Sequence, residues 1–97
     1  MFLPLGGEES FHARVQKYNR VQIPVLVRWK HKLKIGEVLR VEIEELEEGG
    51  EEDFYAKVLD GGRITIPKLV VELLDIQPKA VVHVTLYPMK LPSEEEG

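Results

Sequence analysis

The sequence contains no cysteine, and no apolar stretch in it is long enough to cross a membrane. The lack of cysteine excludes disulfide bonds, thiolate metal sites and a thiol nucleophile. The first ten residues, MFLPLGGEES, lack the basic start and the long apolar run of a secretory signal peptide. We therefore expect a cytoplasmic protein with no membrane partner.

Residues that perform catalysis or bind metals are few and poorly spaced. Serine occurs only as Ser10 and Ser93, and we expect both to lie in mobile tails. The histidines His12, His31 and His83 lack the paired spacing of metal ligands. No acidic run has the ordered oxygen spacing of an EF-hand loop. We expect no enzymatic activity: no catalytic residue, no metal and no cofactor.

The net charge of −4 conceals two halves of opposite sign. Residues 1–43 carry eight Lys and Arg against four Glu, whereas residues 44–97 carry five against thirteen Asp and Glu. Much of this acid lies in residues 44–53 and 94–96, which we expect to be a solvated linker and a tail. The remaining body is basic, so a nucleic-acid partner stays open. The charged content of 31%, with no cysteine, suggests a heat-adapted source.

The sequence repeats itself without a gap. Residues 11–43 align with residues 54–86 at a constant offset of 43, and ten of the 33 aligned positions are identical. A repeat of this length is too short to bury its own core, so the two halves must complete each other. We therefore predict a single domain over residues 1–97, a monomer, with an acidic linker at 44–53 and flexible tails at 1–8 and 90–97.

Each half is predicted to fold as β-β-α-β. Alternating apolar residues indicate the first and third strands, and a turn with Asn or Gly precedes a short second strand. Pro24 and Pro67 then end that strand and begin a helix, predicted near residues 25–32 and 68–75. The fold class expected is mainly β: a six-stranded β-barrel with pseudo-twofold symmetry.

The two helices are expected to bury different stripes. In the second half the apolar stripe is Leu69, Leu73 and Ile76, flanked by further apolar residues. In the first half it shifts to Leu26, Trp29 and Leu33, so this helix is predicted to be rotated or frayed relative to its counterpart. Trp29 could stack on a nucleobase, but its fit to this stripe favours a role in the core.

The segments RVQIPVLVRWKHKLKIGEVLRVEI and GRITIPKLVVELLDIQPKAVVHVTL resemble the core of AbrB/SpoVT-type transition-state regulators. That core runs Gly-Arg-x-x-Ile-Pro, a short helix, a turn with Gly-Asp and a Val-rich strand. In that family two chains interlock as a swapped-hairpin barrel that binds DNA. A chain that carries both halves resembles MraZ-type proteins and the related double-psi and RIFT barrels. The overall likeness is greatest to a small archaeal RIFT-barrel protein. The choice among the three strand orders stays open.

The resemblance implies DNA binding through particular arginines. Arg20 and Arg63 match the arginine of the Gly-Arg motif, and Arg28 matches one of the arginines that follow the proline and help to hold DNA. The second half departs from the pattern, with Val71 in place of Arg28 and Lys79-Ala80 in place of Gly-Asp. A symmetric grip on DNA is therefore not expected.

Clustered Lys and Arg supply the phosphate-neutralising contacts of non-specific nucleic-acid binding. We predict weakly sequence-selective binding of DNA or RNA, typical of an AbrB-like transcription regulator. The alternatives are a solvated charged surface on a protein-interaction adaptor, or a barrel module of unknown role. The residues predicted for nucleic-acid binding are Arg14, Arg20, Arg28, Lys30, Lys32, Lys34, Arg40, Lys57 and Arg63.

Overall fold

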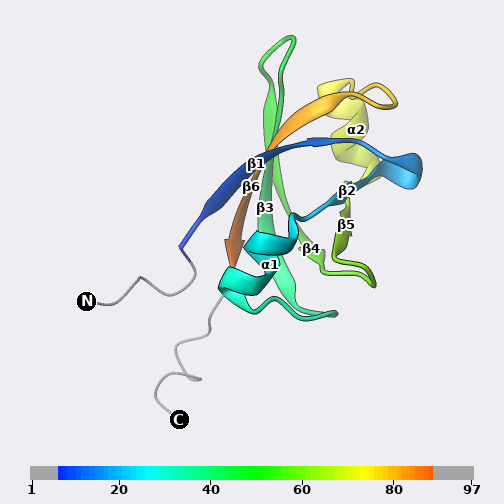
Figure 1. Cartoon of the computed structure of the whole chain (residues 1–97). Helices are drawn as coiled ribbons and strands as arrows, with labels where there is room; N and C mark the ends of the chain where they lie inside the picture. Colours follow the sequence, from blue (N-terminus) through cyan, green and yellow to red (C-terminus); the bar gives the residue numbers. More distant parts are fainter. Residues whose placement is uncertain (1–6, 89–97) are drawn as a thin grey trace.

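The computed structural model describes residues 7–88, which form six strands, two α-helices and one 3-10 turn (Figure 1). The first half contains β1 (Glu9–Arg14), the 3-10 turn η1 (Lys17–Asn19), β2 (Arg20–Gln22), α1 (Val25–His31) and β3 (Val38–Glu45). The second half contains β4 (Glu51–Lys57), β5 (Arg63–Thr65), α2 (Lys68–Leu74) and β6 (Val81–Pro88). The predicted β-β-α-β order of each half is confirmed.

The strands pair between the halves. One antiparallel sheet has the order β1-β6-β3-β4, and a second consists of β2 and β5. The first strand of each half lies beside the last strand of the other half, and exchanging the halves reproduces the same order. Neither half therefore forms a sheet alone, as the repeat length requires.

The expected closed barrel is not observed, because the strands of residues 7–88 form two separate sheets. β2 and β5 have three residues each, and Pro24 and Pro67 follow closely after them. Proline cannot donate to a ladder, so the pairing stops early. Only short links join the sheets, such as the Leu59 N–H donating to Arg63 O at 2.7 Å.

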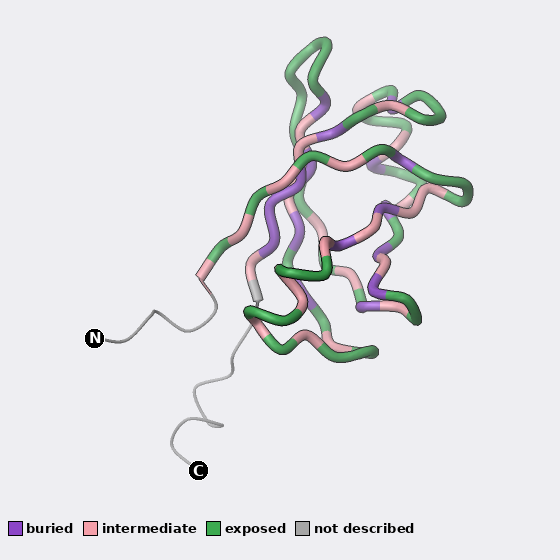
Figure 2. Tube along the Cα trace, viewed as in Figure 1, coloured by how far each residue is buried: buried purple, intermediate pink, exposed green. Residues whose placement is uncertain are grey.

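The core is filled by alternate residues of the strands from both halves (Figure 2). It includes Val21 of β2 and Ile64 of β5, together with Ile23 and Ile66 directly after these strands, all fully buried. The same alternation on the larger sheet buries every second residue of β3 and leaves the others partly or fully exposed. Period-two patterning thus identified the buried positions correctly.

The two helices are equivalent, so the predicted fraying of α1 is wrong. Each has seven residues, begins directly after its proline and ends in a left-handed residue, Lys32 or Asp75. Since both helices last only two turns, the chain entering through the buried end of the preceding short strand sets their orientation. Lys30 is exposed to solvent, whereas the side chains of Arg28 and His31 are partly buried.

The predicted apolar stripes are wrong at four of their six positions and right at Leu33 and Ile76. Leu26 and Trp29 are 73% and 71% exposed, and Leu69 and Leu73 are 64% and 59% exposed. The helices instead turn Val27 and Val70 inward, with the following Leu33 and Ile76. Trp29 is consequently not part of the core.

Two predictions about the connecting segments need correction. Only residues 46–50 of the expected acidic linker 44–53 connect strands, because its two ends belong to the hairpin of β3 and β4. Ser10 lies in β1, where its hydroxyl is 2.9 Å from that of Thr85.

The predicted flexible tails lie almost wholly outside the described residues. No helix of residues 7–88 is long and apolar enough to span a membrane.

Candidate nucleic-acid interface

Two of the predicted arginines share the outer face of the β2–β5 pair. In its register Arg20 lies opposite Thr65, and Gln22 lies opposite Arg63. The intervening pair, Val21 and Ile64, points into the core, so the flanking pairs point outward. Diagonal positions across such a pair are about 7–8 Å apart, close enough for Arg20 and Arg63 to contact one ligand.

A third arginine reaches this face from α1. The side chain of Arg28 lies on the backbone of Gly62, where an added Cβ would be 2.5 Å from its Nε. Gly62 has φ of +79°, so glycine is required there both for the backbone conformation and for the approach of Arg28. Arg63 lies similarly over Gly61, whose carbonyl accepts a hydrogen bond of 2.7 Å from Gln22 Nε2.

Arg20, Arg28 and Arg63, here called the arginine cluster, have no carboxylate partner in the described part of the chain. Among residues 7–88 none of them forms a salt bridge, and the Nε atom of each is buried without a hydrogen-bond acceptor. The ring of Tyr18, 68% exposed, lies 5.7 Å from the Arg20 guanidinium. Since guanidinium groups bind phosphate with several donors, three uncompensated ones on one surface favour a polyanion.

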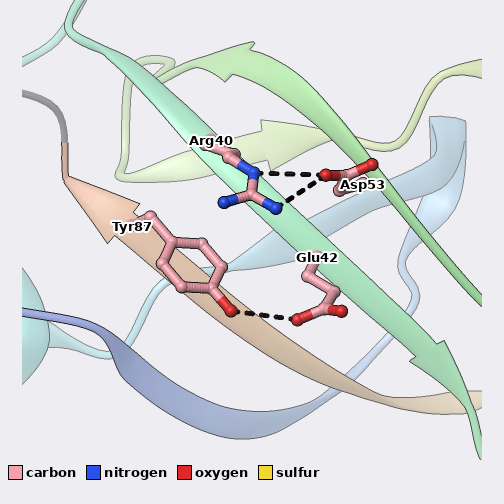
Figure 3. A network of polar contacts seen from close by, with 4 residues as sticks. All are labelled: Arg40, Glu42, Asp53 and Tyr87. Carbon is pink, nitrogen blue, oxygen red and sulfur yellow. Dashed lines mark hydrogen bonds and ion pairs between the residues drawn. The ribbon is translucent and has the colours of Figure 1, made fainter.

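Two other predicted residues are neutralised within the protein. Lys30 Nζ lies 2.7 Å from Glu9 Oε2, which also lies 3.1 Å from His31 Nε2. These contacts, that of Lys30 first, lower the pKa of Glu9. Arg40 donates from Nε and Nη2 to Asp53 Oδ2 at 3.1 and 2.9 Å (Figure 3). The hydrogen bond to Asp53 raises the pKa of Arg40.

Figure 3 shows the surroundings of Arg40 on the outer face of the larger sheet. Its guanidinium stacks 4.7 Å from the ring of Tyr87, whose hydroxyl donates to Glu42 at 3.0 Å. That bond to a carboxylate raises the pKa of Tyr87. This part of the sheet is a mixed network of paired charges, and an anion would find no uncompensated cation at Arg40.

The remaining predicted residues are dispersed. Arg14 lies opposite Val81, and Lys57 lies opposite Val38. Arg14 and Lys57 are therefore on the two opposite edge strands of the four-stranded sheet, β1 and β4. Lys32 and Lys34 are exposed in the loop after α1. The structure thus brings three of the nine residues together in the arginine cluster. No group of three or more His, Asp and Glu side chains within residues 7–88 is arranged to hold a metal ion.

Tyr18 was not predicted to belong to this surface. In the sequence it is only one residue of an expected turn, although the aligned residue in the other half is Gly61. Both adopt positive φ, 64° and 83°. An aromatic residue at a position that glycine fills in the other half was the available signal.

The comparisons with known proteins support the fold. No protein-family model matches the sequence, and no curated protein does. The solution structure of PHS018 from Pyrococcus horikoshii matches with a TM-score of 0.74 and 30% sequence identity. The match covers 84% of this chain and 95% of that one. The chain therefore belongs to the same family as PHS018.

Proposed function

We propose that this protein binds DNA or RNA through the arginine cluster, as a weakly sequence-selective regulator of the AbrB-like type. The observation that carries the proposal is the presence of three arginines on one face of the β2–β5 pair, none with a carboxylate partner among residues 7–88. A two-stranded antiparallel ribbon with outward arginines presents its donors to the phosphate backbone. The cluster consists of phosphate-binding groups and holds no set of side chains arranged to read base edges, so selectivity is weak.

The size of the cluster sets the expected salt dependence. Three phosphates neutralised on duplex DNA correspond to a slope of log K against log salt of about −2.7. Between 50 and 200 mM salt, affinity should therefore fall about 40-fold. This is less than a continuous basic face of all nine predicted residues would give.

The test measures fluorescence anisotropy of labelled mixed-sequence duplex DNA and duplex RNA at several salt concentrations. Arg20→Gln and Arg63→Gln should each weaken binding and reduce the magnitude of the slope by about 0.9. Arg40→Gln is the matched control, since it removes the same charge from a residue already paired with Asp53. Equal losses for Arg40→Gln and Arg63→Gln, or no binding at 50 mM salt, would contradict the proposal.

A second candidate, a protein-interaction adaptor, is favoured by the apolar residues exposed on the helices. Leu26 and Trp29 project from α1, and Leu69 and Leu73 from α2. Trp29 is the sole tryptophan and is 71% exposed, so a partner that covers α1 would shift its emission to shorter wavelength. Trp29→Ser would then weaken that complex without affecting binding of nucleic acid.

A further inference from the structure

An open pocket of about 750 Å³ lies where the end of β1, η1, α2 and the loop after α2 meet. Its floor is apolar and includes Val15, Val71 and Ile76. Its rim carries Arg14, Lys17 and Lys79, and no carboxylate of residues 7–88 lines it. The volume falls within the usual range of small-molecule sites, and the charge of the rim selects an anion.

The pocket is open in one half and filled in the other. With the offset of 43, Val71 corresponds to Arg28 and Asn19 corresponds to Gly62. In the other half the Arg28 side chain lies directly on Gly62, so it occupies space at the position equivalent to Val71 and Asn19. The smaller Val71 leaves that space open beside Asn19. The duplicated fold thus provides its own filled counterpart of the open pocket.

The charges around the two equivalent spaces also differ. The three cations of the rim, Arg14, Lys17 and Lys79, correspond to Lys57, Asp60 and Gly36 in the other half. The net charge of these three positions is therefore +3 around the pocket and zero at the filled counterpart. At these three positions only the open half is cationic, whereas in the other half the cation nearest the equivalent space is Arg28 itself.

Three residues of the pocket adopt a backbone conformation for which the other half uses glycine. Tyr18, Asn19 and Lys79 line the pocket and have positive φ of 64°, 58° and 67°. Their counterparts in the other half are all glycine, Gly61, Gly62 and Gly36, with φ of 83°, 79° and 91°. Glycine adopts this conformation without strain, whereas Tyr and Lys do not. Tyr18 and Lys79 therefore hold an unfavourable conformation where they line the pocket.

We propose that this pocket binds a small free anion with a flat aromatic body, of the chemical class of aryl and nucleoside monophosphates. The phosphate lies against Arg14, Lys17 and Lys79, and the ring lies on the apolar floor beside Tyr18. Lys17 Nζ is 5.3 Å from the Tyr18 ring centre, so this cation lies next to the aromatic surface. The proposal does not depend on nucleic-acid binding, because the arginine cluster contributes no residue to the pocket.

The test is a titration of the ¹⁵N-labelled full chain, followed by amide chemical shifts. The probes are adenosine 5′-monophosphate, adenosine, which lacks the anion, and inorganic phosphate, which lacks the ring. The monophosphate should bind at least tenfold more tightly than either, with shifts concentrated in residues 14–19 and 71–79. Equal affinity for the three probes, or shifts centred on the β2–β5 pair, would overturn the proposal.

One variant closes the pocket by copying the other half. Asn19→Gly with Val71→Met places a long neutral side chain over a glycine, as Arg28 lies over Gly62 in the other half, and adds no cation to the pocket. Binding of the monophosphate should fall at least tenfold, while amide shifts away from the pocket stay unchanged. Lys79→Gly, which copies Gly36, removes one rim cation and should weaken binding several-fold even if the double variant fails to fold. Undiminished affinity in either folded variant would overturn the proposal.

Three further controls distinguish the pocket from its counterpart in the other half, from the arginine cluster and from a site that binds the end of a nucleic-acid chain. Arg28→Val opens the equivalent space in the other half, which has no net cationic rim, and should create no second site for the monophosphate. Arg63→Gln, which alters the arginine cluster away from Tyr18, should leave its affinity unchanged, so failure here and failure of nucleic-acid binding are distinguishable. If a 5′-phosphorylated dinucleotide binds the pocket tenfold more tightly than the monophosphate, the ligand is the end of a nucleic-acid chain and the proposal of a free small molecule is overturned.

Discussion

Replacing Lys79 with glycine should stabilise the protein although it removes a side chain. Lys79 lies in the loop after α2 with φ of +67°, and the equivalent residue of the other half is Gly36 with φ of +91°. Both loops therefore require a left-handed residue, and only one of them has glycine. The Arg14 Nη1 hydrogen bond of 2.8 Å in this loop is accepted by the backbone carbonyl of Lys79, so the substitution preserves it.

The magnitude follows from two opposing contributions. A non-glycine residue in the left-handed region costs about 1–2 kcal/mol. Glycine in turn lowers the stability by about 0.5–1 kcal/mol, because it increases the conformational freedom of the unfolded chain. The midpoints of these ranges leave a net gain for Lys79→Gly of about 0.75 kcal/mol, which corresponds to a rise in Tm of roughly 3–6 °C in a domain of this size.

The assay is thermal and urea unfolding followed by circular dichroism, with Gly36→Lys as the matched reverse substitution. A Cβ at Gly36 would meet no atom within 4 Å, so a lysine there introduces conformational cost without a clash. Gly36→Lys should lower the stability by a similar amount. A loss of stability in Lys79→Gly, or an unchanged Tm in Gly36→Lys, would refute the argument that backbone strain is retained at the pocket.

Other outcomes can be measured on the same preparations. The neighbouring carboxyl group of Glu42 raises the pKa of Glu51 above its usual value of 4.5. Ionisation of Glu51 therefore opposes folding as the pH rises past that value, and Glu51→Gln should raise the Tm at pH 7 but not at pH 3. Glu45 accepts hydrogen bonds from the backbone N–H groups of Glu48 and Glu47, and these bonds lower the pKa of Glu45 below 4.5. The ionised carboxylate therefore stabilises the folded state above that pH, and this stabilisation is lost as the pH falls. Glu45→Gln should lower the Tm at pH 7 but not at pH 3. Ile64→Ala, at a fully buried position, should cost about 2–5 kcal/mol in urea unfolding, whereas Thr65→Ala beside it should change stability by about 0.5 kcal/mol or less. Sedimentation should give the monomer mass of 11.1 kDa, because one chain supplies both halves, and a mass of roughly twice that would contradict this expectation.

The sequence alone predicted the elements and their symmetry. Its ungapped repeat required two halves that share one core. Its period-two patterns identified the buried strand positions, and its two prolines marked where the helices begin. These features are local, since alternation and proline geometry act within a few residues of the chain. They could therefore be read before any tertiary contact was known.

Helix orientation was not predictable in the same way. In α2 the consecutive pairs Leu69–Val70 and Leu73–Leu74 are all apolar, so periodicity does not distinguish the stripe that faces the core. The structure shows that Val70 is buried while Leu69 and Leu73 are exposed. Chain entry from the buried end of β5 decided the rotation, and that is a tertiary constraint.

Tertiary structure also decided which charges remain available. Lys30 and Arg40 looked equivalent to Arg20 and Arg63 in the sequence, yet Glu9 and Asp53 neutralise the first two. These ion pairs join residues distant in the chain, and the register of neighbouring strands determines that of Arg40. The pocket likewise arises where β1, η1 and α2 meet, at positions where the two halves carry different side chains. The sequence determined the repeating frame because that frame follows from local periodicity, whereas the two candidate binding surfaces required the long-range packing that brings their residues together.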